Sequence, residues 1–183
     1  MNEPADPQHS GLVDFYDRVH AAIRSVDPHH ILFLDGNTYA TDFSGFPDDA
    51  GIRWTNTAYA IHDYSVYGFP DAPEPYARTE EQQTRMQKSY AKKRAWMDER
   101  GLCVWNGEWG PVYARPEYEG DATYAINERR YDVLNDQLQL YAKVNLLRIQ
   151  PKTTLTICCP GPTQLVHLAV QGHRLPGHGV RRT

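Results

Sequence analysis

Three short apolar segments, each ending in polar or charged residues, constrain the fold of this chain more than any other feature. The segments are Ile31–Leu34, Ala58–Ile61 and Leu102–Asn106, followed by Asp35-Gly36-Asn37, His62-Asp63-Tyr64 and Gly107-Glu108. Continuous apolar runs of this length are typical of strands buried on both faces of a parallel sheet. We therefore expect parallel strands whose trailing polar residues lie at one edge of a sheet.

Helical patterns separate the predicted strands. Apolar residues recur at helical spacing in residues 12–26, with Ser10 as the expected N-cap. Thr79-Glu80-Glu81-Gln82 has the pattern of a capping box, and Gly101 is a natural end for the helix that it opens. A further helix is expected to be capped by Asp121. This alternation of strands and helices predicts an α/β fold with a parallel sheet.

The polar residues that follow the strands are the candidate functional residues. Asn37, His62, Tyr64 and Glu108 all come just after a predicted strand, and Glu3 lies in a proline-bounded loop near the N-terminus. Parallel α/β folds collect their active sites at the carboxyl ends of the strands. Several polar candidates at one edge therefore carry more weight than any single motif.

Glu108 lies between two glycines, which let the backbone turn sharply and let a ligand approach closely. Trp105 and Trp109 offer flat apolar faces of the kind that stack on sugar rings. Each residue also has a structural interpretation by itself. Glu108 fits a solvated turn, His62 a hydrogen-bonded structural histidine, and Tyr64 and Trp105 core packing.

Composition narrows the class of protein. The 183 residues suit one globular domain, and no apolar run is long enough to span a membrane. The three cysteines have no metal-binding spacing. Residues 137–183 carry six Lys and Arg residues and no acidic residue. These charges are spread without aromatic residues between them, so we expect no nucleic-acid partner.

Three motifs in this order, Asn2-Glu3-Pro4, His62-x-Tyr64 and Asn106-Gly107-Glu108-Trp109-Gly110, resemble those of glycoside hydrolase family 5. This family contains cellulases, mannanases and related retaining β-glycosidases. The resemblance covers about residues 1–145. It implies an α/β fold that is a partial (β/α)8 TIM barrel, about strands 4/5 to 7. Residues 146–183 are expected to form an irregular basic tail, for which we predict no fold.

The resemblance also implies roles for the matching residues. Glu3 is expected to be the acid/base and Glu108 the nucleophile, and Tyr64 is expected to hold Glu108 as a carboxylate by a hydrogen bond. The other expected substrate contacts are Asn2, His62, Asn37 and Trp109. The implied substrate is a β-linked oligosaccharide, polysaccharide or glucoside, and neither a metal ion nor an organic cofactor is needed.

The chain also departs from the family pattern. Such barrels take about 250 residues, and no segment here matches the first three strands or the aromatic residue after the eighth. We therefore expect part of a longer enzyme, whose signal peptide would lie upstream if it is secreted. The alternative to hydrolysis of β-O-glycosidic bonds is a catalytically inactive truncated fragment or a carbohydrate-binding remnant. The sugar, the choice of endo or exo action and the oligomeric state do not follow from the sequence.

Overall fold

The computed structural model describes residues 1–146 and contains a three-stranded sheet in the order β1-β2-β3. The strands are β1 (Leu32–Asp35), β2 (Thr57–Asp63) and β3 (Val104–Trp109). Both neighbouring pairs run parallel. The predicted α/β fold with a parallel sheet is therefore confirmed, whereas the predicted tail lies outside the described residues from residue 147 onward.

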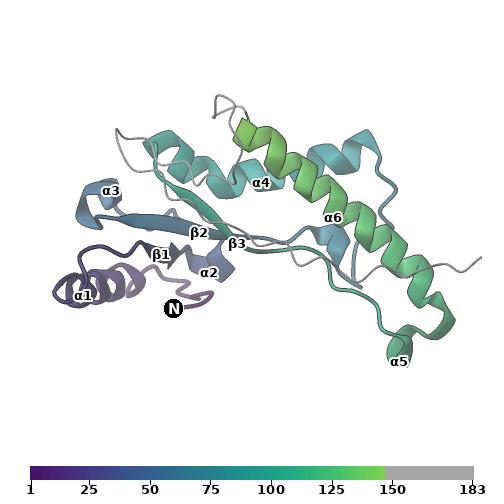
Figure 1. The fold of residues 1–183 in the computed structure, drawn as a ribbon, viewed down its shortest axis with the longest axis horizontal. Helices are drawn as coiled ribbons and strands as arrows, with labels where there is room; N and C mark the ends of the chain where they lie inside the picture. The colour runs from purple at the N-terminus through teal and green to yellow at the C-terminus, as the bar shows by residue number, and fades with distance from the viewer. Residues whose placement is uncertain (147–183) are drawn as a thin grey trace, which may run out of the picture.

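Helices separate the strands, and the two longest are α4 and α6 (Figure 1). Helix α4 packs on β2, whereas α6 contacts α4 and continues past the ends of the strands over the turn after β2. The α-helices are α1 (Leu12–Arg24), α2 (Asn37–Ala40), α3 (Ala50–Arg53), α4 (Glu80–Arg100), α5 (Pro116–Glu119) and α6 (Thr123–Leu146). Two 3-10 turns, η1 (Val66–Gly68) and η2 (Gly120–Ala122), lie in the loops after β2 and β3. Among residues 1–146, every helix is too short or too polar to cross a membrane.

The ends of helix α4 follow the sequence signals. Thr79 accepts a hydrogen bond from the backbone N–H of Gln82, as an N-cap does. In a capping box the Gln82 side chain would accept the backbone N–H of the N-cap residue, Thr79. Here it accepts the N–H of Ala77 instead, two residues earlier. Gly101 closes the helix with a φ of 62°, a left-handed conformation that glycine adopts without strain.

The predicted caps of the other two helices are wrong. Helix α1 has Gly11 at its N-cap, and the Asp6 carboxylate, not Ser10, accepts the N–H groups of Gly11 and Leu12. The Asp6 carboxylate reaches these N–H groups because the loop before α1 folds back toward the start of the helix. Asp121 lies inside the 3-10 turn η2 rather than at the start of α6.

One face of the sheet, here called the helix face, carries the hydrophobic core. Leu34, Tyr59 and Ile61 point to this face and pack with residues of α1 and α4. Tyr59 and Ile61 are 1% and 0% exposed, and burial of an apolar side chain such as that of Ile61 contributes about 1.5–3 kcal/mol. The core therefore fixes the sheet against its helices and leaves the opposite face for other contacts.

The opposite face, here called the alanine face, carries Ala58 and Ala60 of β2. By register, Phe33 of β1 lies beside Ala58 and Trp105 of β3 lies beside Ala60. The Phe33 and Trp105 rings lie 5.4 Å apart although β2 runs between their strands. They can meet only because the alanines beneath them are small, so β2 is buried on both faces, as its apolar run predicts.

An irregularity in β3 determines which way Glu108 points. Asn106 pairs with Ile61 and Glu108 pairs with His62, so Gly107 is an extra residue opposite β2. Side chains in a regular strand alternate between the faces, and a bulge resets that alternation. Without the bulge, Gly107 would pair with His62 and Glu108 would point toward the helices. With it, Glu108 and His62 share the alanine face.

Candidate active site

Two glutamates, a histidine and a tyrosine from three separate segments form one cluster. His62 Nδ1 lies 2.7 Å from Glu3 Oε1 and 3.5 Å from Glu108 Oε2. The Tyr64 hydroxyl donates to Glu108 Oε2 at 3.0 Å. The His62 side chain is 4% exposed, whereas those of Glu3 and Glu108 are 30% and 39% exposed. The cluster therefore has a rigid, buried centre and two carboxylates that a solute can reach.

The spacing of the two carboxylates limits the chemistry they can perform together. One oxygen of Glu3, one oxygen of Glu108 and a ring nitrogen of His62 all lie within 4.8 Å of one another. Carboxyl groups about 5–5.5 Å apart suit attack by one of them on a sugar, whereas about 6.5–9.5 Å leaves room for a water between them. Carboxylate oxygens within 4.8 Å of each other are compatible with the first arrangement.

Asp35, at the end of β1, holds Glu3 in place. Its carboxylate accepts the backbone N–H of Glu3 at 3.0 Å and lies 3.9 Å from His62 Nε2. Glu3 has a φ of 47°, in the left-handed region that non-glycine residues seldom adopt. Conformations of this kind persist only when their surroundings hold them. Asp35 binds the backbone of Glu3 and His62 binds its side chain, and together these contacts hold Glu3 in this conformation.

Tyr64 donates a hydrogen bond to the Glu108 carboxylate. Its pKa is raised above the usual value of about 10, first by desolvation and then by its hydrogen bond to Glu108. The phenol therefore stays protonated at neutral pH and donates its hydrogen bond to the Glu108 carboxylate. The ring also packs against Phe69, with centroids 5.8 Å apart.

The structure does not bring every predicted residue to the cluster. Asn37 is 1% exposed, and its amide is bonded to the backbone of Asp6 and Thr38. It fastens the N-terminal loop to the end of β1. Asn2 is exposed and directly precedes Glu3 in the chain. The expected sugar contacts of both residues remain predictions.

Trp109 lies on the other side of the sheet from Glu108. It pairs with Asp63, whose carboxylate faces helices α4 and α6, and its ring packs edge-on against Tyr141 at 5.6 Å. The physical reason is the alternation of side chains along β3: once Glu108 points to the alanine face, the next residue points away. Its expected sugar contact stays a prediction that this orientation does not favour.

Sequence reasoning missed the residues that support the cluster. Asp35 follows an apolar run directly and Asp63 follows one after His62, and these positions were the available signal. Asp63 is 4% exposed and binds Lys93 Nζ at 2.7 Å and the Tyr141 hydroxyl at 2.8 Å. Since Tyr141 also packs on Trp109, it links the ends of β2 and β3. Nothing in the sequence pattern reveals that long-range link.

The side chains of Glu3, His62 and Glu108 are also close enough to one another to hold a metal ion. Their hydrogen bonds already account for the arrangement: His62 contacts both carboxylates, and Tyr64 donates to Glu108. Two carboxylates and one imidazole are ligands that several divalent cations accept. The expectation that no metal is needed stays a prediction.

Comparisons with known proteins place this geometry in context. The family model described as "Cellulase (glycosyl hydrolase family 5)" matches residues 1–139. A protein of Phanerodontia chrysosporium named "Beta-xylosidase" is 67% identical over 146 residues, which make up 80% of this chain and 30% of that protein. The chain thus spans less than a third of the length of this curated relative.

A solved structure shares the fold at low identity. The crystal structure of the Clostridial cellulose synthase subunit Z (CcsZ) from Clostridioides difficile aligns with a TM-score of 0.51. The alignment covers 72% of this chain and 49% of that one, at 16% sequence identity. At this identity the likeness concerns the arrangement of strands and helices alone.

Proposed function

The chain belongs to glycosyl hydrolase family 5, and from this premise we propose that it hydrolyses β-O-glycosidic bonds by a retaining double displacement. The observation that supports this most strongly is the pair Glu3 and Glu108, with carboxylate oxygens within 4.8 Å and His62 in contact with both. That spacing suits direct attack by a carboxylate on the anomeric carbon.

In the first step Glu108 is the nucleophile and Glu3 the acid. Glu108, held ionised by the Tyr64 hydroxyl, forms a bond to the anomeric carbon. The bond from that carbon to the glycosidic oxygen breaks, and the oxygen takes the proton of Glu3. The products are a glycosyl ester of Glu108 and the free leaving group. Glu3 is then ionised, and His62 remains its hydrogen-bond partner.

In the second step Glu3 acts as the base. It takes a proton from a water molecule whose oxygen bonds to the anomeric carbon, while the ester bond to Glu108 breaks. Glu108 returns to its ionised form, Glu3 returns to its protonated form, and the sugar leaves with its original β configuration. Because the configuration at the anomeric carbon is inverted in each of the two steps, the product keeps the configuration of the substrate.

The family and the name of the relative guide the choice of substrate. We propose a β-linked carbohydrate, with a β-xyloside as the first candidate because the relative is named a β-xylosidase. In this proposal β1, β2 and β3 correspond to strands five to seven of a (β/α)8 TIM barrel, and Glu3 follows the fourth. The helices on one face of the sheet and the cluster at its carboxyl ends support this assignment.

Hydrolysis of nitrophenyl β-xyloside, β-glucoside and β-cellobioside by the full chain tests the proposal. We expect turnover of at least one of these substrates, with Glu108→Gln lowering kcat by more than about 1,000-fold because the nucleophile is lost. Glu81→Gln is the matched control, since Glu81 is an exposed glutamate on α4. Equal rates in the wild type and Glu108→Gln would contradict the proposal.

A second candidate function is carbohydrate binding without turnover. The observation that favours it is a large aromatic pocket beside the cluster, described below, which does not depend on the two glutamates. Sugar binding by a folded chain that shows no turnover would support this second function.

A further inference from the structure

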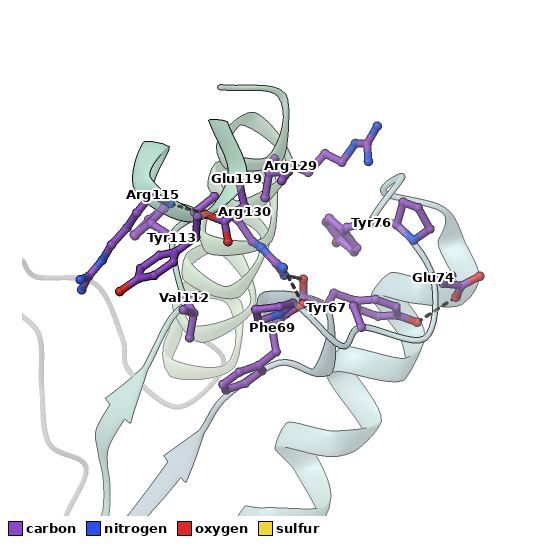
Figure 2. Close-up of a pocket in the computed structure, with 16 residues that line it drawn as sticks. Tyr67, Phe69, Glu74, Tyr76, Val112, Tyr113, Arg115, Glu119, Arg129 and Arg130 are labelled. Carbon is purple, nitrogen blue, oxygen red and sulfur yellow. Dashed lines mark hydrogen bonds between the residues drawn. The ribbon is translucent and has the colours of Figure 1, made fainter. Parts of the chain in front are cut away.

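A pocket of about 790 Å³ lies beside the catalytic cluster, within the range of about 300–1,000 Å³ that is usual for small-molecule sites. The loop after β2, the loop after β3 and the first part of α6 form its walls (Figure 2). Five aromatic side chains line it: Tyr67, Phe69, Tyr76, Tyr113 and Tyr118. Such walls suit a ring-shaped ligand that has both apolar faces and hydroxyl groups.

The pocket shares a wall with the catalytic cluster. Phe69 lines the pocket, and its ring packs against that of Tyr64, the donor to Glu108. The two loops are joined where Gly68 accepts the backbone N–H of Val112 at 2.8 Å. A Cβ on Gly68 would come within 3.1 Å of the Pro111 backbone, so glycine permits this close approach. The pocket is therefore preformed next to the reacting centre.

Arg130 gives the pocket a buried positive charge. It extends from α6 and donates to the carbonyl oxygens of Tyr67 and Phe69 (Figure 2). It is 8% exposed and, among the described residues, it forms no ion pair with a carboxylate. Desolvation lowers its pKa, and the charge of Asp71 only partly opposes that effect. Two carbonyl groups do not neutralise a cation, and an unpaired buried charge is costly.

A second buried arginine shows the usual arrangement. Arg94 is 6% exposed and lies 3.0 Å from the Asp98 carboxylate. The two glutamates that line the pocket are engaged elsewhere. Glu74 accepts the Tyr67 hydroxyl, and Glu119 accepts the N–H of Arg115. Where Arg94 has a carboxylate partner, Arg130 has only carbonyl oxygens among the described residues. Its charge is therefore available to an anionic ligand.

We propose that this pocket binds a uronate unit, a sugar ring bearing a carboxylate, with the carboxylate against Arg130 and the ring against the aromatic walls. This deepens the proposed function and rests on it, because the pocket would hold the part of a glycoside next to the reacting sugar. A guanidinium group pairs well with a carboxylate, and tyrosine rings stack on sugar rings. Neutral sugars of the same shape would lack the ionic contact.

Calorimetric titration of the full chain with methyl β-glucuronide and methyl β-glucoside tests this inference, because the two probes differ in the carboxylate. The Glu108→Gln protein is used to exclude turnover. We expect the glucuronide to bind about tenfold more tightly and to keep part of that advantage at 1 M salt, because salt screens a buried ion pair less than an exposed one. Arg130→Gln should abolish the preference, whereas Arg130→Lys should retain part of it.

Arg18→Gln is the matched control, because Arg18 is an exposed arginine on α1 and does not line the pocket. It should change the affinity less than about twofold. If Arg130→Gln does not fold, the comparison of the two probes on the parent protein still decides the outcome. Equal affinity for both probes, or no binding of the glucuronide by folded protein, overturns the inference.

The two proposals can fail separately. A preference for the glucuronide in a chain that hydrolyses none of the nitrophenyl substrates would overturn the proposed hydrolysis and leave the uronate site intact. Hydrolysis that is lost in Glu108→Gln, together with no preference for the glucuronide, would leave the proposed function standing and overturn the uronate site alone.

Discussion

At the scale of single residues, His62 holds the two carboxylates in their relative positions. Its ring is buried, and one nitrogen contacts both Glu3 and Glu108. With a proton on Nδ1, the 2.7 Å contact is an N–H···O bond to Oε1 in both states of Glu3, provided that the acid proton is carried by Oε2. In the proposed mechanism Glu3 is protonated in one step and ionised in the next, and it keeps this partner throughout.

Tyr64→Phe should lower kcat without unfolding the chain. The change removes the hydrogen bond to Glu108 and leaves the ring that packs on Phe69. Because a hydrogen bond to a charged group contributes about 1.5–3 kcal/mol, we expect a loss of about 10- to 100-fold. Initial rates on a nitrophenyl glycoside, with circular dichroism as the check on folding, measure this.

The pH dependence of the same variant gives an independent check. The pKa of Tyr64 is raised, so its proton is retained through neutral pH and lost only above about pH 10. The wild type should lose the contribution of this hydroxyl only in that alkaline range, and Tyr64→Phe should lack that loss. A variant as active as the wild type at pH 7 would show that the hydrogen bond has no part in the reaction.

The sequence predicted the cluster better than its surroundings. Glu108, His62 and Tyr64 were singled out because they follow apolar runs, and parallel strands bring such positions to one edge. The orientation of Trp109 does not follow from the sequence, because the bulge at Gly107, which no periodicity reveals, determines which face each later residue of β3 points to. The hydrogen bonds of Asn37 do not follow from it either, because their partner, the backbone of Asp6, lies in a loop whose path the sequence does not specify. The expected sugar contacts of both residues stay predictions.

At the scale of elements, the bulge in β3 gives Gly107 a role in the site. A Cβ on Gly107 would lie 3.5 Å from His62 Nε2 and from the Trp105 ring, which is ordinary contact on the alanine face. Its backbone is not in the left-handed region, so a side chain is tolerated there. A longer side chain would therefore occupy the space beside the two carboxylates.

Gly107→Leu should reduce kcat/KM by about 100-fold, because displacement of a substrate by about 1 Å has an effect of that size. Gly107→Ala should have a much smaller effect, and both variants should unfold at nearly the same temperature as the wild type. Steady-state kinetics and thermal unfolding measure the two properties. Unchanged kinetics in Gly107→Leu would mean that the substrate does not approach this part of β3.

Helix α6 is tied to the segment before α4 through Asp136. This carboxylate is 8% exposed and accepts from Tyr76, Arg78 and Gln83. Burial acts to raise its pKa, but these three hydrogen bonds outweigh that effect, so its pKa is lowered. The ionised form is thus favoured in the folded chain, and its contribution to stability depends on pH.

Asp136→Asn should lower the free energy of unfolding at pH 7 by about 1–3 kcal/mol. Since the folded pKa is depressed, this contribution is present above the unfolded pKa of about 3.9 and is lost as pH falls through the folded pKa. The difference between wild type and variant should therefore shrink below about pH 4. Urea unfolding between pH 7 and pH 3 measures it.

Asp132→Asn is the control for that experiment, because Asp132 is an exposed partner of the same arginine, Arg78. Its effect should stay below about 1 kcal/mol. A stability difference for Asp136→Asn that stays constant down to pH 3 would show that the ionised carboxylate is not what joins the two elements.

At the scale of the whole molecule, the sheet brings together proposed catalytic groups that are distant along the chain. Glu3 precedes β1 and Glu108 lies in β3, and they meet because β1, β2 and β3 are parallel and adjacent. The alternation of apolar runs and helices made this architecture predictable. The pocket around Arg130 was not, because it forms where two irregular loops meet one helix.

The measurement that tests the central claim most directly is covalent trapping with a 2-deoxy-2-fluoro β-glycoside carrying a dinitrophenolate leaving group. The fluorine slows hydrolysis of the ester, so the sugar remains on the nucleophile and peptide mass spectrometry can locate it. We predict one sugar on Glu108 in the wild type and in Glu81→Gln, and none in Glu108→Gln. A sugar on any other residue, or no adduct on the folded wild-type chain, would contradict the assignment of Glu108 as the nucleophile.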